Sequence, residues 1–120
     1  DQSTRRRPRG AQQPSPQLGE SMGCQVIFSP RSIARLEEIV RYIARENSDA
    51  ALRLGMKLID RAELLAEFPE LGRPFSKRAG VRRLSVRPYL IYYRYKPAEQ
   101  VVEILDFWHG ARREPEFLSR

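Results

Sequence analysis

The sequence predicts an α+β fold: a helical hairpin packed on a small antiparallel β-sheet, with the elements in the order β-α-α-β-β-β. Three observations support this fold class. A short β-prone run comes first, two stretches with apolar residues at helical spacing follow, and three alternating stretches close the pattern. A chain of 120 residues, 41% of them hydrophobic, suffices for one such domain with a modest core.

The pattern occupies only part of the chain. Residues 1–23 contain three prolines, three glycines and hardly any large apolar side chains. Such a stretch buries too little apolar surface to offset the entropy of ordering it, so we expect a disordered N-terminal extension there. Residues 24–113 are expected to form the domain, and residues 114–120 a flexible C-terminal tail.

The β-prone run at residues 26–28 predicts the first strand. Ser29 is a good N-cap and Pro30 suits the first helical position, so the first helix should begin here. Apolar residues recur at helical spacing after Pro30, and the helix is expected to end near Asn47.

A second helix is expected to begin at Ser48 and Asp49 by the same capping logic, and Pro69 should stop it. Because the link between the two helices is short, they are expected to lie antiparallel. Gly55 lies inside the second helix at some cost to its stability, and close approach to the first helix is one reason to tolerate it.

The last part of the chain predicts a sheet. Residues 71–74 form a turn signal, and strands are expected at residues 81–87, 89–96 and 101–109. Three sequential strands with short links form an antiparallel meander, and the first strand is expected to join the same sheet.

The positive charge of the chain is segregated. The net charge is +7, with an isoelectric point near 10.2, which favours acidic partners. Residues 29–70 carry seven basic and eight acidic side chains, whereas residues 71–98 carry eight basic and no acidic ones. The predicted sheet and the loop before it should therefore form the positive surface.

Alternation divides the basic and aromatic residues between two sheet faces. Tyr89, Tyr93 and Tyr95 share one face, and Tyr92 shares the other with Arg94. An open face that carries arginine and tyrosine could hold RNA through phosphate contacts and base stacking, or an acidic peptide. Alternatively, the tyrosines pack on the helices and the arginines are solvated.

The chain lacks the residues that several kinds of metal, phosphate-binding and catalytic site require. His109 is the only histidine and Cys24 the only cysteine, so no zinc-site spacing exists, and no glycine-rich phosphate loop is present. We predict no metal and no cofactor. Glu103 and Asp106 are expected on opposite strand faces, which argues against a carboxylate pair. His109 suits the role of a structural hydrogen-bond donor better than that of a lone general acid or base.

The lone cysteine, the lack of an apolar run long enough to span a membrane and the lack of a secretory signal predict a cytoplasmic location without membrane contact.

Four segments together carry a resemblance. "VIFSPRSIARLEEIVRYI", "FPELGRP", "VRRLSVRPYLIYYRY" and "VVEILDFWHGARR" are similar to the RelE/ParE superfamily of bacterial type II toxins, over residues 25–113. The resemblance implies a small toxin held inactive by a cognate antitoxin, which is expected to be small, acidic and of the ribbon-helix-helix type. RelE-type members cleave mRNA on the ribosome without a metal. ParE-type members act on DNA gyrase and block replication.

Two positions favour the ParE branch. Ribonuclease members carry an arginine directly after the tyrosine that opens the penultimate strand, where this chain has Leu90 after Tyr89. They also tend to carry a tyrosine beyond the last strand, where this chain has Phe117. We therefore expect a ParE-like toxin that inhibits growth through DNA gyrase and is not an enzyme. The alternative is a RelE-like, metal-independent, ribosome-dependent mRNA endonuclease that uses Arg83, Arg112 and His109.

The basic residues are the predicted contacts with the target or the antitoxin. They are Arg73, Lys77, Arg78, Arg82, Arg83, Arg87, Arg94, Arg112 and Arg113. Arginine side chains suit pairing with carboxylates of an acidic antitoxin. A helix of the antitoxin is expected to bury its apolar side in a groove beside the two predicted helices.

Overall fold

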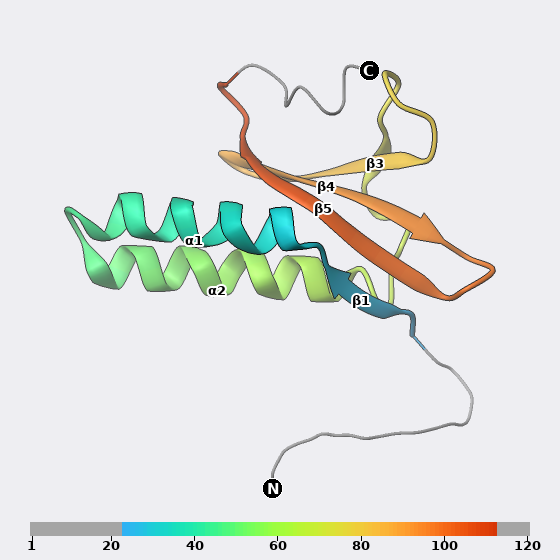
Figure 1. Ribbon diagram of the computed structural model, residues 1–120, viewed down its shortest axis with the longest axis horizontal. Helices are drawn as coiled ribbons and strands as arrows, with labels where there is room; N and C mark the ends of the chain where they lie inside the picture. Colours follow the sequence, from blue (N-terminus) through green and yellow to red (C-terminus); the bar gives the residue numbers. More distant parts are fainter. Residues whose placement is uncertain (1–22, 113–120) are drawn as a thin grey trace, which may run out of the picture.

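A computed structural model describes residues 23–112, in which two helices cover one face of a five-stranded sheet (Figure 1). The elements are β1 (Gln25–Phe28), α1 (Pro30–Ala44), α2 (Ser48–Leu64), β2 (Arg73–Pro74), β3 (Val81–Val86), β4 (Tyr89–Lys96) and β5 (Val101–His109). The predicted α+β class and helical hairpin are confirmed. The expected N-terminal extension, the C-terminal tail, Arg113 and Phe117 lie outside the described residues, apart from Gly23.

The sheet has the strand order β1-β5-β4-β3-β2. The strands β3, β4 and β5 form the predicted antiparallel meander. The first strand joins the same sheet, as expected, but it runs parallel to β5, from Gln25 beside Val101 to Phe28 beside Ile104. The sheet is therefore mixed and not purely antiparallel. A parallel pair needs a long crossover connection, and the chain between β1 and β5 supplies one.

The predicted turn at residues 71–74 contains a further short strand. Arg73 pairs with Arg83 and Pro74 pairs with Arg82, which makes β2 the edge of the sheet beyond β3. An edge strand tolerates proline because one side of its backbone needs no partner in the ladder.

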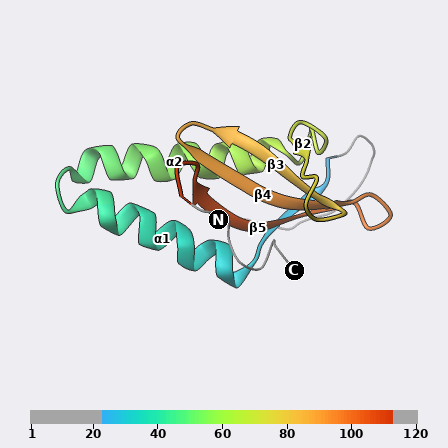
Figure 2. The same ribbon diagram turned by 90° about the horizontal axis from the view of Figure 1, so that it is seen from above.

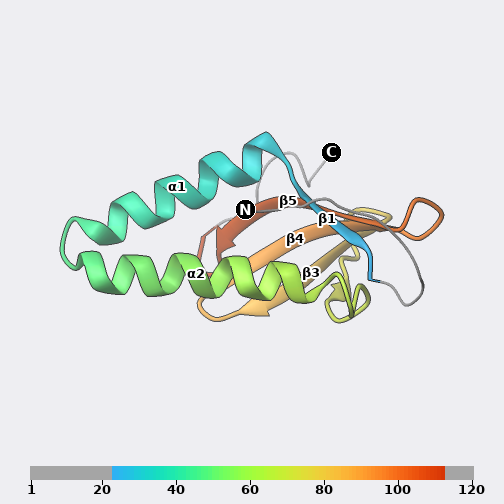
Figure 3. The same ribbon diagram turned by 90° about the horizontal axis from the view of Figure 1, so that it is seen from below.

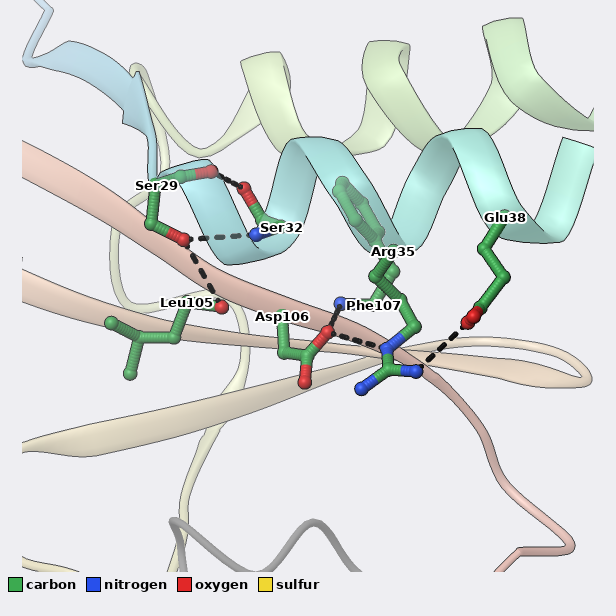
Figure 4. A network of polar contacts seen from close by, with 7 residues as sticks. All are labelled: Ser29, Ser32, Arg35, Glu38, Leu105, Asp106 and Phe107. Atoms are coloured by element: carbon green, nitrogen blue, oxygen red, sulfur yellow. Dashed lines mark hydrogen bonds and ion pairs between the residues drawn. The ribbon is translucent and has the colours of Figure 1, made fainter.

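Ser29 caps α1 as predicted and also ties the helix to the sheet (Figure 4). Its hydroxyl oxygen accepts a hydrogen bond from the Ser32 N–H at 3.1 Å and donates one to the Leu105 carbonyl at 3.2 Å. The cap therefore fixes where the helix starts and where it lies along β5.

The ends of the helices differ from the expected ones. The cap of α2 is Asn47, whose side chain accepts from the Ala50 N–H at 2.9 Å, and Ser48 is the first helical residue. The helix α2 ends at Leu64 and not at Pro69, because the Leu65 N–H turns to the Ala62 carbonyl in a tighter bond. No helix within residues 23–112 has the length and apolar character needed to cross a membrane.

The main core lies between the hairpin and the sheet, and Figure 3 shows the hairpin lying across that face. Its fully buried members include Leu58 and Leu65 of α2, Ile91 and Tyr93 of β4, and Phe107 of β5.

A second, smaller cluster covers the opposite side of the sheet, which faces the viewer in Figure 2 and is called the open face below. It contains Phe75, Val81 and Tyr92, with Leu90 and Trp108 packed against it.

Three of the five tyrosines belong to these cores and not to the surface. Tyr92 and Tyr93 are fully buried, and Tyr89 is 8% exposed. The idea that tyrosines stack on bases from an open face is therefore wrong for these three residues. The alternative that they pack on the helices is confirmed for Tyr89 and Tyr93, whereas Tyr92 packs on the opposite side of the sheet. The alternation of the sequence had assigned each of the three tyrosines to the correct face of the sheet. Tyr92 is nevertheless not exposed, because Phe75 covers it edge-on with the ring centroids 5.4 Å apart.

The hydroxyl of Tyr93 locks the "LGRP" segment onto the sheet. It accepts a hydrogen bond from the Gly72 N–H at 2.9 Å and donates one to the Pro69 carbonyl at 2.8 Å. Burial raises the pKa of Tyr93, which keeps the donated proton in place. A Cβ on Gly72 would lie 2.8 Å from the Tyr93 ring and 2.9 Å from the Arg83 carbonyl oxygen, so glycine is required by space.

We expect Tyr93→Phe to destabilise the protein by roughly 1–3 kcal/mol, because it leaves a buried N–H and a carbonyl without their partner. Urea unfolding at a constant m-value measures the change. Tyr42→Phe is the matched control, since the Tyr42 side chain is 69% exposed and its variant should unfold like the parent. Equal stability of the Tyr93 variant and the parent would show that the hydroxyl does not hold the segment.

Gly72→Ala should also destabilise the protein, by roughly 1–3 kcal/mol, because its methyl group has no room beside the Tyr93 ring. Thermal unfolding followed by circular dichroism checks this. Ser76→Ala changes an exposed residue of the following loop and serves as the comparison. A Gly72 variant that melts at the parent temperature contradicts the close contact.

Candidate functional site

Three of the predicted basic residues lie on the open face. Arg83 lies opposite Tyr92 in the β3–β4 ladder, and its guanidinium carbon is 5.4 Å from the centroid of the Phe75 ring. Arg73 pairs with Arg83, and Arg94 pairs with Val81 of the open-face cluster. Partners in a ladder share a face, so these three cations point to the same side.

The other predicted basic residues are placed differently. Arg82 points to the helix side, where its Nη1 donates to the Gly72 carbonyl at 2.6 Å and its Nη2 lies 3.8 Å from a carboxylate oxygen of Glu70. Lys77 and Arg78 lie in the loop between β2 and β3, and Arg87 in the turn between β3 and β4. Alternation separates Arg82 from Arg83, so the predicted set does not form one patch.

A bulge in β5 changes the face of one acidic residue. Tyr92 pairs with Asp106 and Tyr93 pairs with Ile104, which leaves Leu105 as an extra residue. Glu103 pairs with Arg94, which shares a β4 face with Tyr92. Glu103 and Asp106 are therefore on the same face, and the prediction of opposite faces is wrong because strict alternation does not hold across a bulge.

Asp106 is fully buried at the junction of α1 and β5 (Figure 4). Its Oδ1 accepts from the Phe107 N–H at 2.9 Å and from Nε of Arg35 at 3.2 Å. Its Oδ2 is buried and has no hydrogen-bond partner within residues 23–112. Burial raises the pKa of Asp106, and the Arg35 guanidinium opposes this rise.

The Arg35 side chain is held from two sides. Its Nη1 donates to Glu38 Oε1 at 2.9 Å, while Nε is bound to the buried Asp106. Glu38 is 62% exposed at its side chain, so this second ion pair is weak and easily exchanged. The guanidinium carbon of Arg35 lies 4.4 Å from the centroid of the Trp108 ring, which adds a cation–π contact.

A cleft of about 680 Å³ opens beside this junction, and we call it the Trp108 cleft. Its walls include Arg35, Tyr42, Tyr89, Trp108, His109 and Arg112. The guanidinium carbon of Arg112 lies 4.9 Å from the same Trp108 ring that Arg35 contacts. Two cations and several aromatic rings therefore meet at the place where β5 ends beside α1.

The "HGAR" segment is fixed by backbone contacts. The Gly110 N–H donates to the Pro88 carbonyl at 2.7 Å, and a Cβ on Gly110 would press to 3.1 Å from that oxygen. Nδ1 of His109 accepts from the Ala111 N–H at 3.1 Å, and its ring meets Tyr89 edge-on at 5.2 Å. In this contact His109 is a hydrogen-bond acceptor and not the donor expected of it, and the segment carries Arg112 to the cleft.

The three residues of the ribonuclease alternative are not gathered in one cleft. His109 and Arg112 both line the Trp108 cleft, but Arg83 does not. His109 pairs with Tyr89 on the helix side, whereas Arg83 pairs with Tyr92 on the open face. Arg83 and His109 therefore lie on opposite faces of the sheet.

Sequence reasoning missed Arg35, Glu38, Asp106 and Trp108 as members of a site. Arg35 and Asp106 are 71 residues apart in the sequence, and nothing local links them. The only available signals were the spacing of Arg35 and Glu38 by three residues on one helix and the position of Trp108 beside His109.

A second hollow of about 540 Å³, the hairpin groove, lies along α1 and α2. Apolar residues dominate its lining, including Leu36, Val40, Leu52, Met56 and Ile59. Leu52 is 62% exposed and Met56 57% exposed. Gly55 lies beneath this groove, where a Cβ would approach the Val40 Cγ2 to 3.1 Å, in agreement with the close helix contact that its sequence position suggested.

Within residues 23–112, no group of three or more histidine, cysteine, aspartate and glutamate side chains is arranged to hold a metal ion. The site as described consists of guanidinium groups, aromatic rings and two apolar-lined hollows. These groups suit the binding of an anionic or amphipathic partner.

Comparisons with known proteins agree with this fold. The family model described as the ParE toxin of the type II toxin-antitoxin system parDE matches residues 26–114. The chain is 36% identical over 96 residues to the putative toxin Y4kP of Sinorhizobium fredii, covering 78% of this chain and 96% of that one. It is 39% identical over 89 residues to toxin RelE2 of Caulobacter vibrioides, covering 73% of this chain and 97% of that one.

A solved structure, the chromosomal ParDE toxin–antitoxin system from P. aeruginosa, superposes with a TM-score of 0.62 at 21% identity, over 72% of this chain and 95% of that one. At this identity the likeness concerns the fold. The family match and the two sequence relatives cover nearly the whole of the described region. The chain therefore belongs to the family of ParE toxins of type II toxin–antitoxin systems.

Proposed function

We propose that this toxin inhibits bacterial growth by binding DNA gyrase, without cleaving RNA, and that an acidic cognate antitoxin neutralises it. The observation that carries the proposal is the placement of Arg83 and His109 on opposite faces of the sheet. Cleavage of RNA by these side chains would need a base and the stabilising cations around one phosphate group. The absence of an arginine at Leu90 supports the same conclusion.

The open face supports a role in protein binding. Arg73, Arg83 and Arg94 project from neighbouring strands, over a cluster whose one tyrosine, Tyr92, is already packed. Guanidinium groups in such an arrangement form paired hydrogen bonds with carboxylates of a partner protein. Base stacking would need exposed rings at this place, and Tyr92 is fully buried.

The hairpin groove supports the binding of an antitoxin helix. The groove is apolar, runs along two helices and carries exposed Leu52 and Met56, which is the surface that an amphipathic helix covers. The P. aeruginosa structure of the same fold is of a ParDE toxin–antitoxin system. We assign the groove to the apolar side of the antitoxin, and the basic open face to its acidic residues.

We expect the purified toxin to inhibit supercoiling by DNA gyrase and to leave ribosome-bound mRNA intact in an active translation extract. The double variant Arg73→Ala/Arg83→Ala should weaken the inhibition by about 2- to 30-fold, because two exposed ion pairs of roughly 0.2–1 kcal/mol each are lost. Arg53→Ala/Lys57→Ala removes the same charge from exposed positions of α2 and serves as the control.

The competing activity has support from the relative named toxin RelE2 and from the shared position of His109 and Arg112 in the Trp108 cleft. It would appear in the translation extract as cleavage of ribosome-bound mRNA. Two results together would overturn the proposed function in favour of endonuclease activity: mRNA cleavage that falls sharply in the Arg112→Ala variant, and normal supercoiling by gyrase in the presence of the toxin.

Met56→Gln should weaken binding of the antitoxin about 5- to 30-fold, since roughly 1–2 kcal/mol of apolar burial in the hairpin groove is lost. It should leave inhibition of gyrase unchanged. Isothermal titration of the purified toxin with its antitoxin measures the affinity. Lys57→Gln alters the neighbouring exposed residue of α2, and equal affinities of the two variants would exclude the groove as the docking surface.

A further inference from the structure

The Trp108 cleft has features that neither the family match nor the proposed use of the other surfaces explains. It joins a helix and a strand end that are distant in sequence, and it has a fixed cation at its base. Nε of Arg35 is held by a fully buried carboxylate, so its guanidinium stays at the cleft whatever the exposed Glu38 does. Within residues 23–112, Nη2 of Arg35 has no partner.

Arg112 supplies a second cation from the other end of the cleft. Its side chain is in contact with the Trp108 ring and forms no ion pair within residues 23–112. Both guanidinium groups therefore contact the same indole ring, and the cleft presents two cations to a bound anion. A carboxylate bound beside the indole would accept hydrogen bonds from one guanidinium group and be attracted by the other.

The remaining walls favour a polypeptide over a nucleic acid. Ile39, Tyr42, Tyr89 and Trp108 offer apolar surface, which suits a side chain next to the carboxylate. Because Glu38 and Asp106 balance the two arginines, the cleft can take one acidic group in exchange for the exposed Glu38, but it lacks the excess positive charge that a chain of phosphates needs. The volume of about 680 Å³ is sufficient for two or three side chains.

We infer that the Trp108 cleft binds one acidic side chain of a partner polypeptide together with the apolar residue beside it. The partner is the antitoxin, so this identification rests on the proposed function. The acidic group replaces Glu38 at Nη1 of Arg35 or takes Nη2, and the charge of Arg112 at the same indole ring attracts it. The apolar neighbour packs on Tyr42 and Ile39 of α1.

Trp108 is the only tryptophan of the chain, so its fluorescence reports directly on this cleft. The probes are the peptide acetyl-Phe-Glu-Leu-amide, its glutamine counterpart acetyl-Phe-Gln-Leu-amide, and a uridylate hexamer, each titrated at up to millimolar concentration into the full-length protein. We expect a saturable change with the glutamate peptide, and binding about tenfold weaker for the glutamine peptide, which lacks the charge.

Arg112→Gln should weaken binding of the glutamate peptide about tenfold and reduce the preference for glutamate over glutamine. Arg112 is exposed at the end of the described region, so its loss should not disturb folding, which circular dichroism verifies. Arg53→Gln removes one exposed charge from α2 and should bind like the parent. The double variant Arg35→Leu/Asp106→Asn removes the fixed cation together with its buried counter-charge and should also bind more weakly.

Three results of these titrations would overturn the inference: no saturable response to the glutamate peptide, equal binding of the two peptides, or tighter binding of the uridylate hexamer that depends on Arg112. The last result would assign the cleft to a nucleic acid. The peptide titrations need no gyrase and no antitoxin, so they can succeed although the proposed function fails. If the antitoxin neutralises the toxin but binds Arg112→Gln with parental affinity, the proposed function stands and this use of the cleft does not.

Discussion

The joint between Ser29 and β5 determines how the helical layer meets the sheet. The Ser29 N–H donates to the Ile104 carbonyl at 3.0 Å, and its hydroxyl donates to the Leu105 carbonyl while capping α1. Leu105 is the extra residue of the β5 bulge, so the start of α1 is bonded directly to the bulge. Because α1 begins at this point, Arg35 lies about one and a half turns further along, beside the Asp106 side chain.

Much of the fold was predictable because local signals agreed with the final packing. Proline at the first helical position, a serine cap and apolar residues at helical spacing are enough to specify α1. Strict alternation likewise specifies β3 and β4, which pair with each other in an uninterrupted register. Local sequence signals failed where a contact between distant segments determines which strands pair. The parallel pairing of β1 and the short strand β2 depend on neighbours that no local pattern describes.

The candidate site was predictable only in composition. The segregation of basic residues correctly indicated the sheet, but the face of each residue depends on its register, which separates Arg82 from Arg83. Tyr92 was placed on the correct face, yet its exposure was misjudged because Phe75 comes from a loop and covers it. The pairing of Arg35 with Asp106 joins two distant segments and leaves no trace in either one.

The pairing of β1 with β5 has a consequence for synthesis on the ribosome. The first strand to leave the ribosome forms its ladder with the last one, through Gln25–Val101 to Phe28–Ile104. Until β5 has emerged, β1 has no strand to pair with and α1 lacks its contacts with the carbonyls of Ile104 and Leu105. A prematurely terminated chain that ends before β5 therefore lacks the strand that joins β1 to the meander, and incomplete translation cannot complete the sheet.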